Sequence, residues 1–296
     1  MSTVEVEGRR LALTNLDKVL WPAVGRTKGW LLEYYTRIAP VLLPHLSERP
    51  LTLRRFPDGV EGPSWHQNEC RGEPDWFHVF RTTGRGGRQL RFCVVDDLAS
   101  LLWLANQAVI ELHPFQWLLE APRQPNVLVF DLDPGPPADV VECARVALLL
   151  RDLLDDLGLI SYPKTSGSLG LHVHAPLGQP HQGDQVKAFA RTVAEALAQR
   201  YPDQVVAAMK KTTRRGRVFV DWLQNDPTRQ TVVPYSLRGA PVPTVATPVS
   251  WEEVEQAVAN GRPEALTFLA EHVLERVNGQ GDLFADVLEV RQPLPV

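Results

Sequence analysis

The chain has 296 residues, of which 44% are apolar and 22% charged; this composition is typical of a globular protein with one large domain or two small ones. Its formal net charge of -4 at pH 7 excludes a general attraction to polyanions, so a nucleic-acid partner would need a local basic patch. The cysteines Cys70, Cys93 and Cys143 form no Cys-x-x-Cys pair, which argues against a structural zinc site or a disulfide framework.

The first predicted helix follows Thr27. Apolar residues from Tyr34 to Ala39 recur at helical spacing. Pro40 and Pro44 come directly afterwards, and proline inside a helix removes a backbone hydrogen bond and clashes with the preceding turn. We therefore expect the two prolines to disrupt this helix.

Basic and aromatic residues flank the first predicted strand, which covers residues 49–56. Arg54 and Arg55 stand at its end, before a Pro-Asp-Gly turn.

Two lysines and a tryptophan have two interpretations each. Lys18 and Lys28 are either solvated surface charges or a phosphate clamp. Trp65 is either a core residue or a platform on which a base stacks.

A predicted hairpin comes next, with strands over 76–80 and 90–95 and a Gly/Arg-rich tip over 82–88. The segment 97–112 has apolar residues at helical spacing and is predicted to be a helix. His113 would then lie at a helix terminus, as a partner of a backbone carbonyl or as an anion contact.

A buried strand is predicted over residues 126–135, where four apolar residues precede Asp131-Leu132-Asp133-Pro134-Gly135. Side chains alternate along a strand, so Asp131 and Asp133 point to the same side. Two carboxylates this close raise each other's pKa, and a divalent cation is the usual means of keeping both ionised. The pattern indicates a Mg²⁺ or Mn²⁺ site, although two acids that only cap a turn remain an alternative.

The rest of the chain alternates helices and strands. A helix, a strand, a glycine-spaced turn, a strand and a helix are predicted in this order: 140–157, 159–165, 166–170, 171–176 and 184–200. His172 and His174 share one face of their strand. This alternation favours an α/β or α+β fold.

The densest basic run, residues 210–217, precedes a predicted strand over 218–225 that places Asp221 much as the earlier strand places Asp131 and Asp133. Helical periodicity returns from Trp251 to the end of the chain. Neither the polar N-terminus nor any apolar stretch suggests a targeting or membrane-spanning segment. We therefore expect a cytoplasmic location.

Three motifs in this order resemble those of the archaeo-eukaryotic primase superfamily: Asp131-x-Asp133, Ser166-Gly167-Ser168-x-Gly170-Leu171-His172 and Val218-Phe219-Val220-Asp221-Trp222. The resemblance is strongest to the polymerase domain of bacterial ATP-dependent DNA ligase D and its stand-alone relatives. It extends from about Leu13 to about Pro248 and includes Lys18, Lys28 and the segment from Pro234 to Gly239.

The resemblance implies an α+β fold whose central, mostly antiparallel sheet is flanked by helices, with an N-terminal α/β subdomain. A single domain over 1–296 would have a DNA-binding part (1–120), a catalytic core (121–250) and C-terminal helices (251–296). Whether the chain is an excised domain or a separate protein stays open.

The implied activity is template-dependent nucleotidyl transfer that fills short gaps at double-strand breaks in bacterial non-homologous end joining and favours ribonucleotides. The implied metal ligands, for two Mn²⁺ or Mg²⁺ ions, are Asp131, Asp133 and Asp221. The implied nucleoside triphosphate site consists of Ser166, Ser168, His172, His113, Gln224 and Arg238. The residues implied to bind DNA, including a 5′-phosphate, are Lys18, Lys28, Arg54, Arg55, Trp65 and Arg214.

The resemblance also implies a Ku-like protein and a DNA ligase as partners, and a nucleoid-associated place in the cytoplasm. One residue departs from the family pattern, because Leu169 stands where the turn usually carries a lysine. Two other functions are weighed against the polymerase. One is a non-catalytic module that bridges DNA ends, and the other, less favoured, is a metal hydrolase that uses Asp131, Asp133, His172 and His174.

Overall fold

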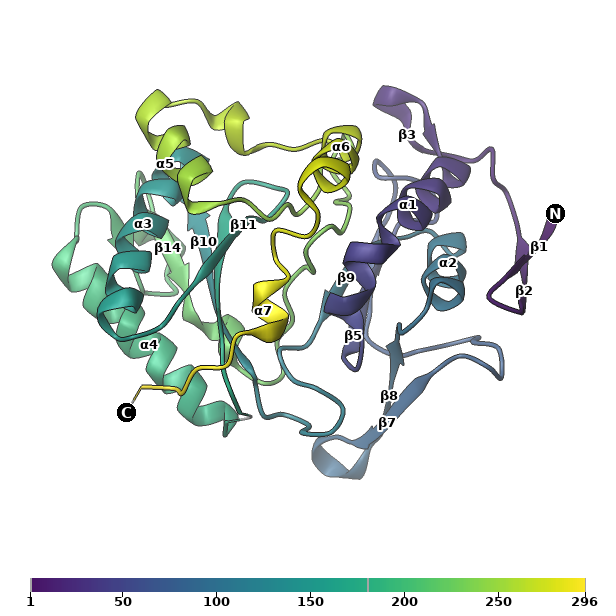
Figure 1. Ribbon diagram of the computed structural model, residues 1–296, viewed down its shortest axis with the longest axis horizontal. Helices are drawn as coiled ribbons and strands as arrows, with labels where there is room; N and C mark the ends of the chain where they lie inside the picture. Colours follow the sequence, from purple (N-terminus) through teal and green to yellow (C-terminus); the bar gives the residue numbers. More distant parts are fainter. Residues whose placement is uncertain (1, 180, 296) are drawn as a thin grey trace.

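Two five-stranded sheets form the framework of the computed structural model, which describes residues 2–179 and 181–295. Figure 1 shows them in separate halves of the molecule, with the C-terminal segment running between the halves. The strands of the central sheet, in spatial order, are β11 (Tyr162–Thr165), β12 (Leu171–Pro176), β10 (Val127–Pro134), β14 (Val218–Asp221) and β13 (Val205–Val206). All neighbours in it are antiparallel except β13 and β14. The predicted α+β class is confirmed.

One face of the central sheet is apolar and covered by helices. Leu128, Phe130 and Leu132 alternate along β10 and are fully buried. The helices α3 (Val140–Asp156) and α4 (Gly183–Arg200) pack on β10. This packing fixes β10 and directs its other side chains, Asp131 and Asp133, to the opposite face.

The sheet of the N-terminal half consists of β5 (Pro50–Arg55), β6 (Trp65–Gln67), β7 (Val79–Thr83), β8 (Gln89–Val94) and β9 (Val109–Pro114). The helices of this half are α1 (Lys28–Leu46) and α2 (Leu98–Asn106), which pack against each other. The smaller hairpins are β1 (Ser2–Val6) with β2 (Arg9–Leu13) and β3 (Val19–Trp21) with β4 (Arg26–Thr27). The helices near the C-terminus are α5 (Trp251–Asn260), α6 (Ala270–Gln280) and α7 (Asp286–Glu289).

The expected disruption of the first helix at its prolines is wrong. Helix α1 continues through Pro40 and Pro44 to Leu46. Both prolines lie on its exposed side, whereas its apolar stripe, with Ile38 and Leu42, is fully buried. Burial of this stripe outweighs the lost backbone hydrogen bonds.

The helix expected over 97–112 is also wrong in its second half. Helix α2 ends at Asn106, and Ala108 has a φ of 58°, which turns the chain out of the helix. Val109 and Ile110 then begin β9, which pairs with β5. His113 therefore lies in a strand and not at a helix terminus.

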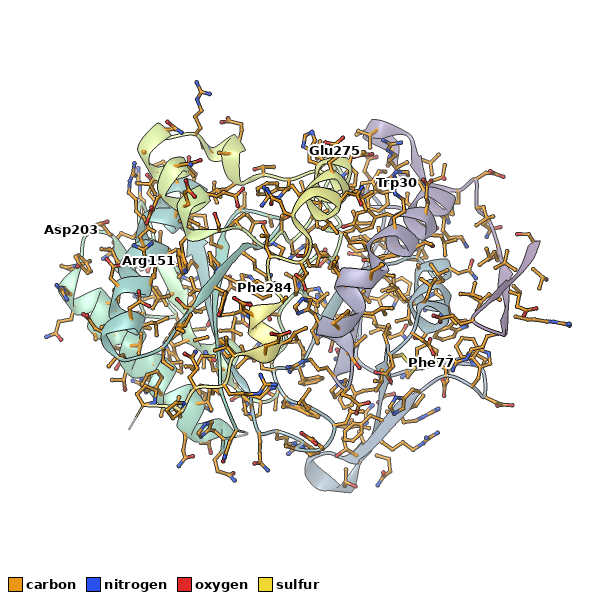
Figure 2. All side chains as sticks on the ribbon, viewed as in Figure 1. Trp30, Phe77, Arg151, Asp203, Glu275 and Phe284 are labelled. Atoms are coloured by element: carbon orange, nitrogen blue, oxygen red, sulfur yellow. A yellow bond between two sulfur atoms is a disulfide. The ribbon has the colours of Figure 1, made fainter. Side chains whose placement is uncertain are left out.

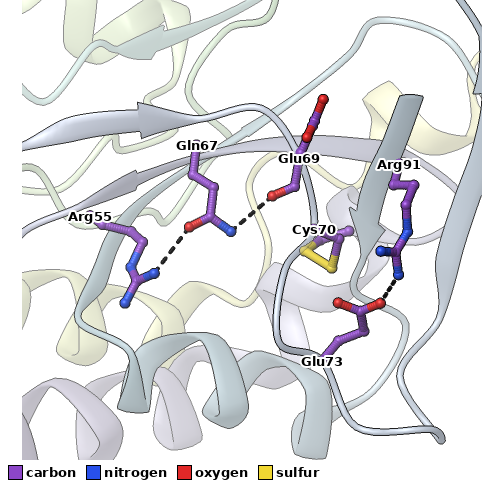
Figure 3. The surroundings of a disulfide bond; sticks show 7 residues. Arg55, Gln67, Glu69, Cys70, Glu73 and Arg91 are labelled. Atoms are coloured by element: carbon purple, nitrogen blue, oxygen red, sulfur yellow. Dashed lines mark hydrogen bonds and ion pairs between the residues drawn. A yellow bond between two sulfur atoms is a disulfide. The ribbon is translucent and has the colours of Figure 1, made fainter. Parts of the chain in front are cut away.

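The expected absence of disulfides is wrong as well, because Cys70 and Cys93 are joined (Figure 3). They are 23 residues apart, and their spacing gave no sign of the pairing. The Cys70 N–H donates to the carbonyl of Arg91 at 2.8 Å, which lays the segment after β6 along β8. The Cα atoms of the two cysteines are then 4.9 Å apart, a normal separation for a disulfide. Cys143 is free and buried.

The segment after α6 joins the two halves. Asp282 accepts a hydrogen bond from the Tyr235 hydroxyl at 2.6 Å, and its other oxygen lies 2.8 Å from Nε2 of His45 in α1. Phe284 is 1% exposed and lies at the centre of the molecule in Figure 2. In the part of the chain that the structure describes, no helix is long and apolar enough to cross a membrane.

Candidate active site

A row of four directly opposed residues, Lys164, His172, Asp131 and Asp221, crosses the face of the central sheet opposite α3 and α4. Asp131 in β10 is the pairing partner of Asp221 on one side and of His172 on the other. His172 is in turn the partner of Lys164. Directly opposed residues in antiparallel strands have neighbouring side chains. Register therefore brings two carboxylates together, and Asp133 lies two residues further along the same face.

Burial and mutual repulsion act against charging these carboxylates. Burial, and then the charges of Asp131 and Asp221, raise the pKa of Asp133 to about 7. Burial raises the pKa of Asp131 to about 6, against the opposing charges of Lys164 and Arg238. Burial, and then the charge of Asp131, also raise the pKa of Asp221. A cation between the carboxylates would relieve this cost.

The donor chemistry fits Mg²⁺ or Mn²⁺, because hard divalent cations take carboxylate oxygens. Among residues 2–179 and 181–295, no group of three or more His, Cys, Asp or Glu side chains is arranged so that it could hold a metal ion. The fit therefore rests on the placement and raised pKa values of Asp131, Asp133 and Asp221. Asp221 is also oriented, since its oxygens accept hydrogen bonds from the Leu223 N–H at 3.0 Å and from Gln224 Nε2 at 3.0 Å.

A cavity of about 250 Å³ opens beside the carboxylates. Its lining includes Asp131, Asp133 and all six residues predicted to bind the nucleotide: Ser166, Ser168, His172, His113, Gln224 and Arg238. The sequence motifs are far apart in the chain, and the fold brings them to one space.

The turn from Ser166 to Gly170 forms one wall of this cavity. Gly167 has a φ of 69°, and a Cβ atom at Gly170 would lie 2.1 Å from the Leu132 carbonyl oxygen. Both positions therefore require glycine. The Ser166 hydroxyl oxygen accepts hydrogen bonds from the N–H groups of Ser168 and Gly170 at 3.2 and 3.1 Å. These two N–H groups are thus engaged within the turn.

Glu111 organises the basic side of the cavity, and sequence reasoning missed it. It is 1% exposed and lies within 3.6 Å of Arg238, 3.1 Å of Arg54 and 2.9 Å of His113. Burial would raise its pKa, but the His113 hydrogen bond and the Arg238 charge hold it at about 2. The signal was the pair Glu111-x-His113, which a strand places on one face and the expected helix would have separated.

His172 and Lys164 stand behind the carboxylates. Nε2 of His172 lies 3.3 Å from Oδ1 of Asp131. Burial, and then the charge of Lys164, lower the pKa of His172 well below its usual value, so its imidazole is neutral. Lys164 is fully buried, and its ammonium has no hydrogen-bond partner among the described residues. Sequence reasoning missed this lysine because nothing marked its side chain as buried.

Lys18 and Lys28 lie side by side across the β3–β4 hairpin, where the Lys28 N–H donates to the Lys18 carbonyl at 2.8 Å. The Lys18 ammonium is partly exposed and lies 2.8 Å from Asp58. Lys28 is 5% exposed, and its ammonium donates to the Asn106 carbonyl at 2.9 Å. The hairpin therefore places the two lysines next to each other, while their ammonium groups are engaged with Asp58 and the Asn106 carbonyl.

Arg54, Arg55 and Trp65 lie together on β5 and β6. Arg55 and Trp65 are pairing partners, and the guanidinium lies 5.6 Å from the ring centre. Trp65 is 46% exposed, which favours the stacking platform over a core role. Arg54 is paired with Glu111, which also contacts His113 and Arg238 in the cavity wall.

The basic run meets the end of β10. The Arg214 guanidinium lies 3.6 Å from the centre of the Phe219 ring. A Cβ atom at Gly135 would lie 1.9 Å from the Arg214 carbonyl oxygen, so only glycine fits between these segments. The Arg214 charge lowers the pKa of Asp133 against the larger effect of burial. Arg214 thus lies next to the carboxylates and apart from Lys18 and Lys28.

A family model for the primase-polymerase domain of LigD matches residues 27–284. The chain belongs to this family. The LigD domain match includes all three carboxylates and the six residues around the cavity.

Curated LigD proteins are similar over most of this chain. The multifunctional non-homologous end joining protein LigD of Mycobacterium bovis is 39% identical over 284 residues, which cover 93% of this chain and 36% of that protein. The bifunctional LigD of Bacillus subtilis is 30% identical over 289 residues, covering 97% and 46%. The chain therefore spans less than half the length of these relatives.

A solved structure has the same fold. The polymerase domain from Mycobacterium tuberculosis ligase D, in complex with DNA, matches with a TM-score of 0.88 and 38% identity, covering 96% of this chain and 99% of that one. In this LigD-family chain, Leu169 is 71% exposed and lines the cavity beside the carboxylates. The departure from the family pattern thus lies on the cavity wall itself.

Proposed function

We propose that the chain is a template-dependent nucleotidyltransferase that fills short gaps at DNA double-strand breaks in non-homologous end joining. The observation that carries this proposal is the meeting of Asp131, Asp133 and Asp221 beside a cavity lined by Arg238, His113 and the serine turn. Carboxylates beside a cationic pocket suit a triphosphate, because nucleotidyl transfer depends on positioning and charge stabilisation.

The chain's own residues would hold the reacting groups. Asp131, Asp133 and Asp221 would ligate two Mg²⁺ or Mn²⁺ ions, which supply charge neutralisation and activation of the primer hydroxyl. Arg238 and His113, both held by Glu111, would orient the triphosphate. Because Glu111 fixes both groups before substrate arrives, little reorganisation would be needed on binding.

The DNA would extend from the cavity across the N-terminal half. Trp65 and Arg55 would contact unpaired bases and backbone, and Arg214 would hold DNA on the side of Asp133. Lys18 and Lys28 would bind the 5′-phosphate on the far side of the gap, since two adjacent ammonium groups suit a terminal dianion. A preference for ribonucleotides, and a Ku-like protein and a DNA ligase as partners, belong to the same proposal.

The test is primer extension across a one-nucleotide gap with a 5′-phosphate, with Mn²⁺ or Mg²⁺ and with ribonucleotides or deoxyribonucleotides. We expect extension by the wild-type chain and a loss of at least a hundredfold in Asp133→Asn. The matched control is Asp152→Asn, which changes an exposed acid on α3. Extension by Asp133→Asn at the wild-type rate would refute the proposal. Tight binding of the gapped DNA without incorporation would favour a non-catalytic bridging module instead.

A further inference from the structure

A second cavity, of about 330 Å³, lies on the same face of the N-terminal sheet as the nucleotide site. Thr52 lines it and is the pairing partner of His113, which lines the first cavity. Phe115 follows His113 by two residues and therefore points to the same side of the sheet. Gln230 lines both cavities. The two spaces are neighbours.

The floor of this cavity is aromatic. Phe92, Phe115 and Trp117 form their own buried cluster, separate from the main core, with Phe80 and Leu90 packed against it. The centroid of the Phe115 ring lies 5.2 Å from that of Phe92 and 5.0 Å from that of Trp117. The indole N–H of Trp117 donates to the Pro227 carbonyl at 2.9 Å, which fixes the orientation of the ring. A planar ring system would find a rigid surface on which to stack.

Polar groups stand over this floor. Thr52 is 3% exposed, and its hydroxyl has no hydrogen-bond partner among the described residues. Buried hydroxyl groups are normally paired, so an unpaired one that lines a cavity indicates a missing ligand or water. Asn68 and Arg123 also line the cavity. Arg88 is already paired with Glu69, whereas Arg123 makes no ion pair with any residue that the structure describes.

We propose that this cavity binds the base of an unpaired nucleotide in the DNA held at the active site. An aromatic floor with a few polar groups above it is the usual receptor for an extruded base, and about 300–1,000 Å³ is the usual size of a small-ligand pocket. Thr52 and Asn68 would bond the base edge, and Arg123 would pair with the phosphate. The assignment rests on the proposed function for the presence of DNA.

The position of the cavity limits which nucleotide it can take. Arg55 is at one end of β5, near Lys18 and Lys28, and Thr52 lies three residues closer to the other end. The aromatic floor is thus on the opposite side of the nucleotide site from the lysine pair. Because the lysines would hold the downstream 5′-phosphate, the base would come from an unpaired nucleotide upstream of the reacting position, as at a frayed or mismatched break end.

The test uses photocrosslinking. Duplex DNA with a single-stranded 3′ tail carries 5-iododeoxyuridine at each unpaired position in turn, and fully paired duplex is the control. After irradiation and reduction, tryptic cleavage releases residues 92–123 as one peptide, which contains Phe92, Phe115 and Trp117. We expect a crosslink to this peptide from at least one unpaired position and none from paired DNA. Absence of this crosslink at every unpaired position would overturn the assignment.

A matched pair of variants tests the cavity itself. Thr82 lines the cavity, whereas Thr83 points to the other face of the hairpin. Thr82→Trp fills the space and should abolish the crosslink and weaken binding of tailed DNA about tenfold, which corresponds to about 1.4 kcal/mol. Thr83→Trp adds the same bulk outside and should change neither. An undiminished crosslink in Thr82→Trp would contradict the assignment.

Filling of a one-nucleotide gap by the wild-type chain, measured in parallel, keeps this inference separate from the proposed function. Gap filling without the crosslink overturns only the base-binding cavity. The crosslink without gap filling supports the cavity and refutes the polymerase.

Discussion

The Asn225 side chain makes the backbone hydrogen bonds of β10 that a neighbouring strand would otherwise make. Strand β14 ends at Asp221, so beyond that point β10 has no backbone neighbour on this side. The Asn225 side chain fills the gap. Its Oδ1 accepts from the Val129 N–H at 2.9 Å, and its Nδ2 donates to the Val129 carbonyl at 2.7 Å and the Trp222 carbonyl at 3.0 Å. Asn225 is fully buried.

Asn225→Ala should therefore leave the Val129 N–H and carbonyl buried without hydrogen-bond partners. An unsatisfied buried polar group costs about 1–3 kcal/mol, so the two together should lower the free energy of unfolding by about 2–6 kcal/mol. For a chain of this size, the melting temperature should fall by roughly 2 °C per kcal/mol, or about 4–12 °C.

The loss is measured by urea denaturation with Asn278→Ala as the control, because Asn278 is exposed on α6 and should change stability little. The change should also reach the active site, since Asp131 is two residues beyond Val129 in β10. We expect weaker binding of Mn²⁺ by calorimetry in the folded variant. A loss below about 0.5 kcal/mol, within the range of ordinary surface substitutions, would refute the view that Asn225 completes the sheet.

Three further predictions follow from the site and the disulfide. Leu169→Lys should lower the KM for nucleoside triphosphate several-fold with little effect on stability, because Leu169 is exposed on the cavity wall; an unchanged KM would place this position outside the triphosphate contact. Cys70→Ser should lower the free energy of unfolding by about 3 kcal/mol, because the disulfide closes a loop of 23 residues. The loss should appear only in the absence of reductant. Equal urea midpoints of the wild-type chain and the variant in oxidising buffer would mean that the disulfide does not form. The raised pKa values of Asp131 (about 6) and Asp133 (about 7) mean that the metal-free folded chain binds protons more tightly than the unfolded chain. It should therefore lose stability as the pH rises from about 4 to about 7, and Asp133→Asn should flatten this slope; an unchanged slope in the variant would show that Asp133 is not the group responsible.

The strand that carries Asp131 and Asp133 and the turn over residues 166–170 could be predicted from the sequence because their signals are local. Asp131 and Asp133 follow an apolar run with the period of a strand, and the serine turn is marked by its glycines. Such patterns indicate strands and turns without knowledge of their partners. They do not give register, so the direct opposition of Asp131 and Asp221 became visible only in the sheet.

What could not be predicted depends on contacts between distant residues. The apolar residues of 97–112 fit a helical period, which predicts His113 at a helix terminus; only the pairing of β9 with β5 overrides this period. The Cys70–Cys93 bond likewise requires that the segment after β6 lie along β8. No local sequence pattern marks Asn225, because its hydrogen bonds to Val129 depend on the end of β14 at Asp221.

The hydrogen bonds of the segment after α6 determine where this chain can be truncated or fused to another. The family match ends at residue 284, yet Gln292 beyond it bonds both backbone groups of Ile160, each at 2.8 Å. Asp282, just inside that limit, bonds both His45 of α1 and Tyr235. A boundary drawn at the last residue of the family model would remove α7 and Gln292 and leave Phe284 at the end of the chain. Fusions or truncations should therefore keep the hydrogen bonds of Gln292 and not stop at residue 284.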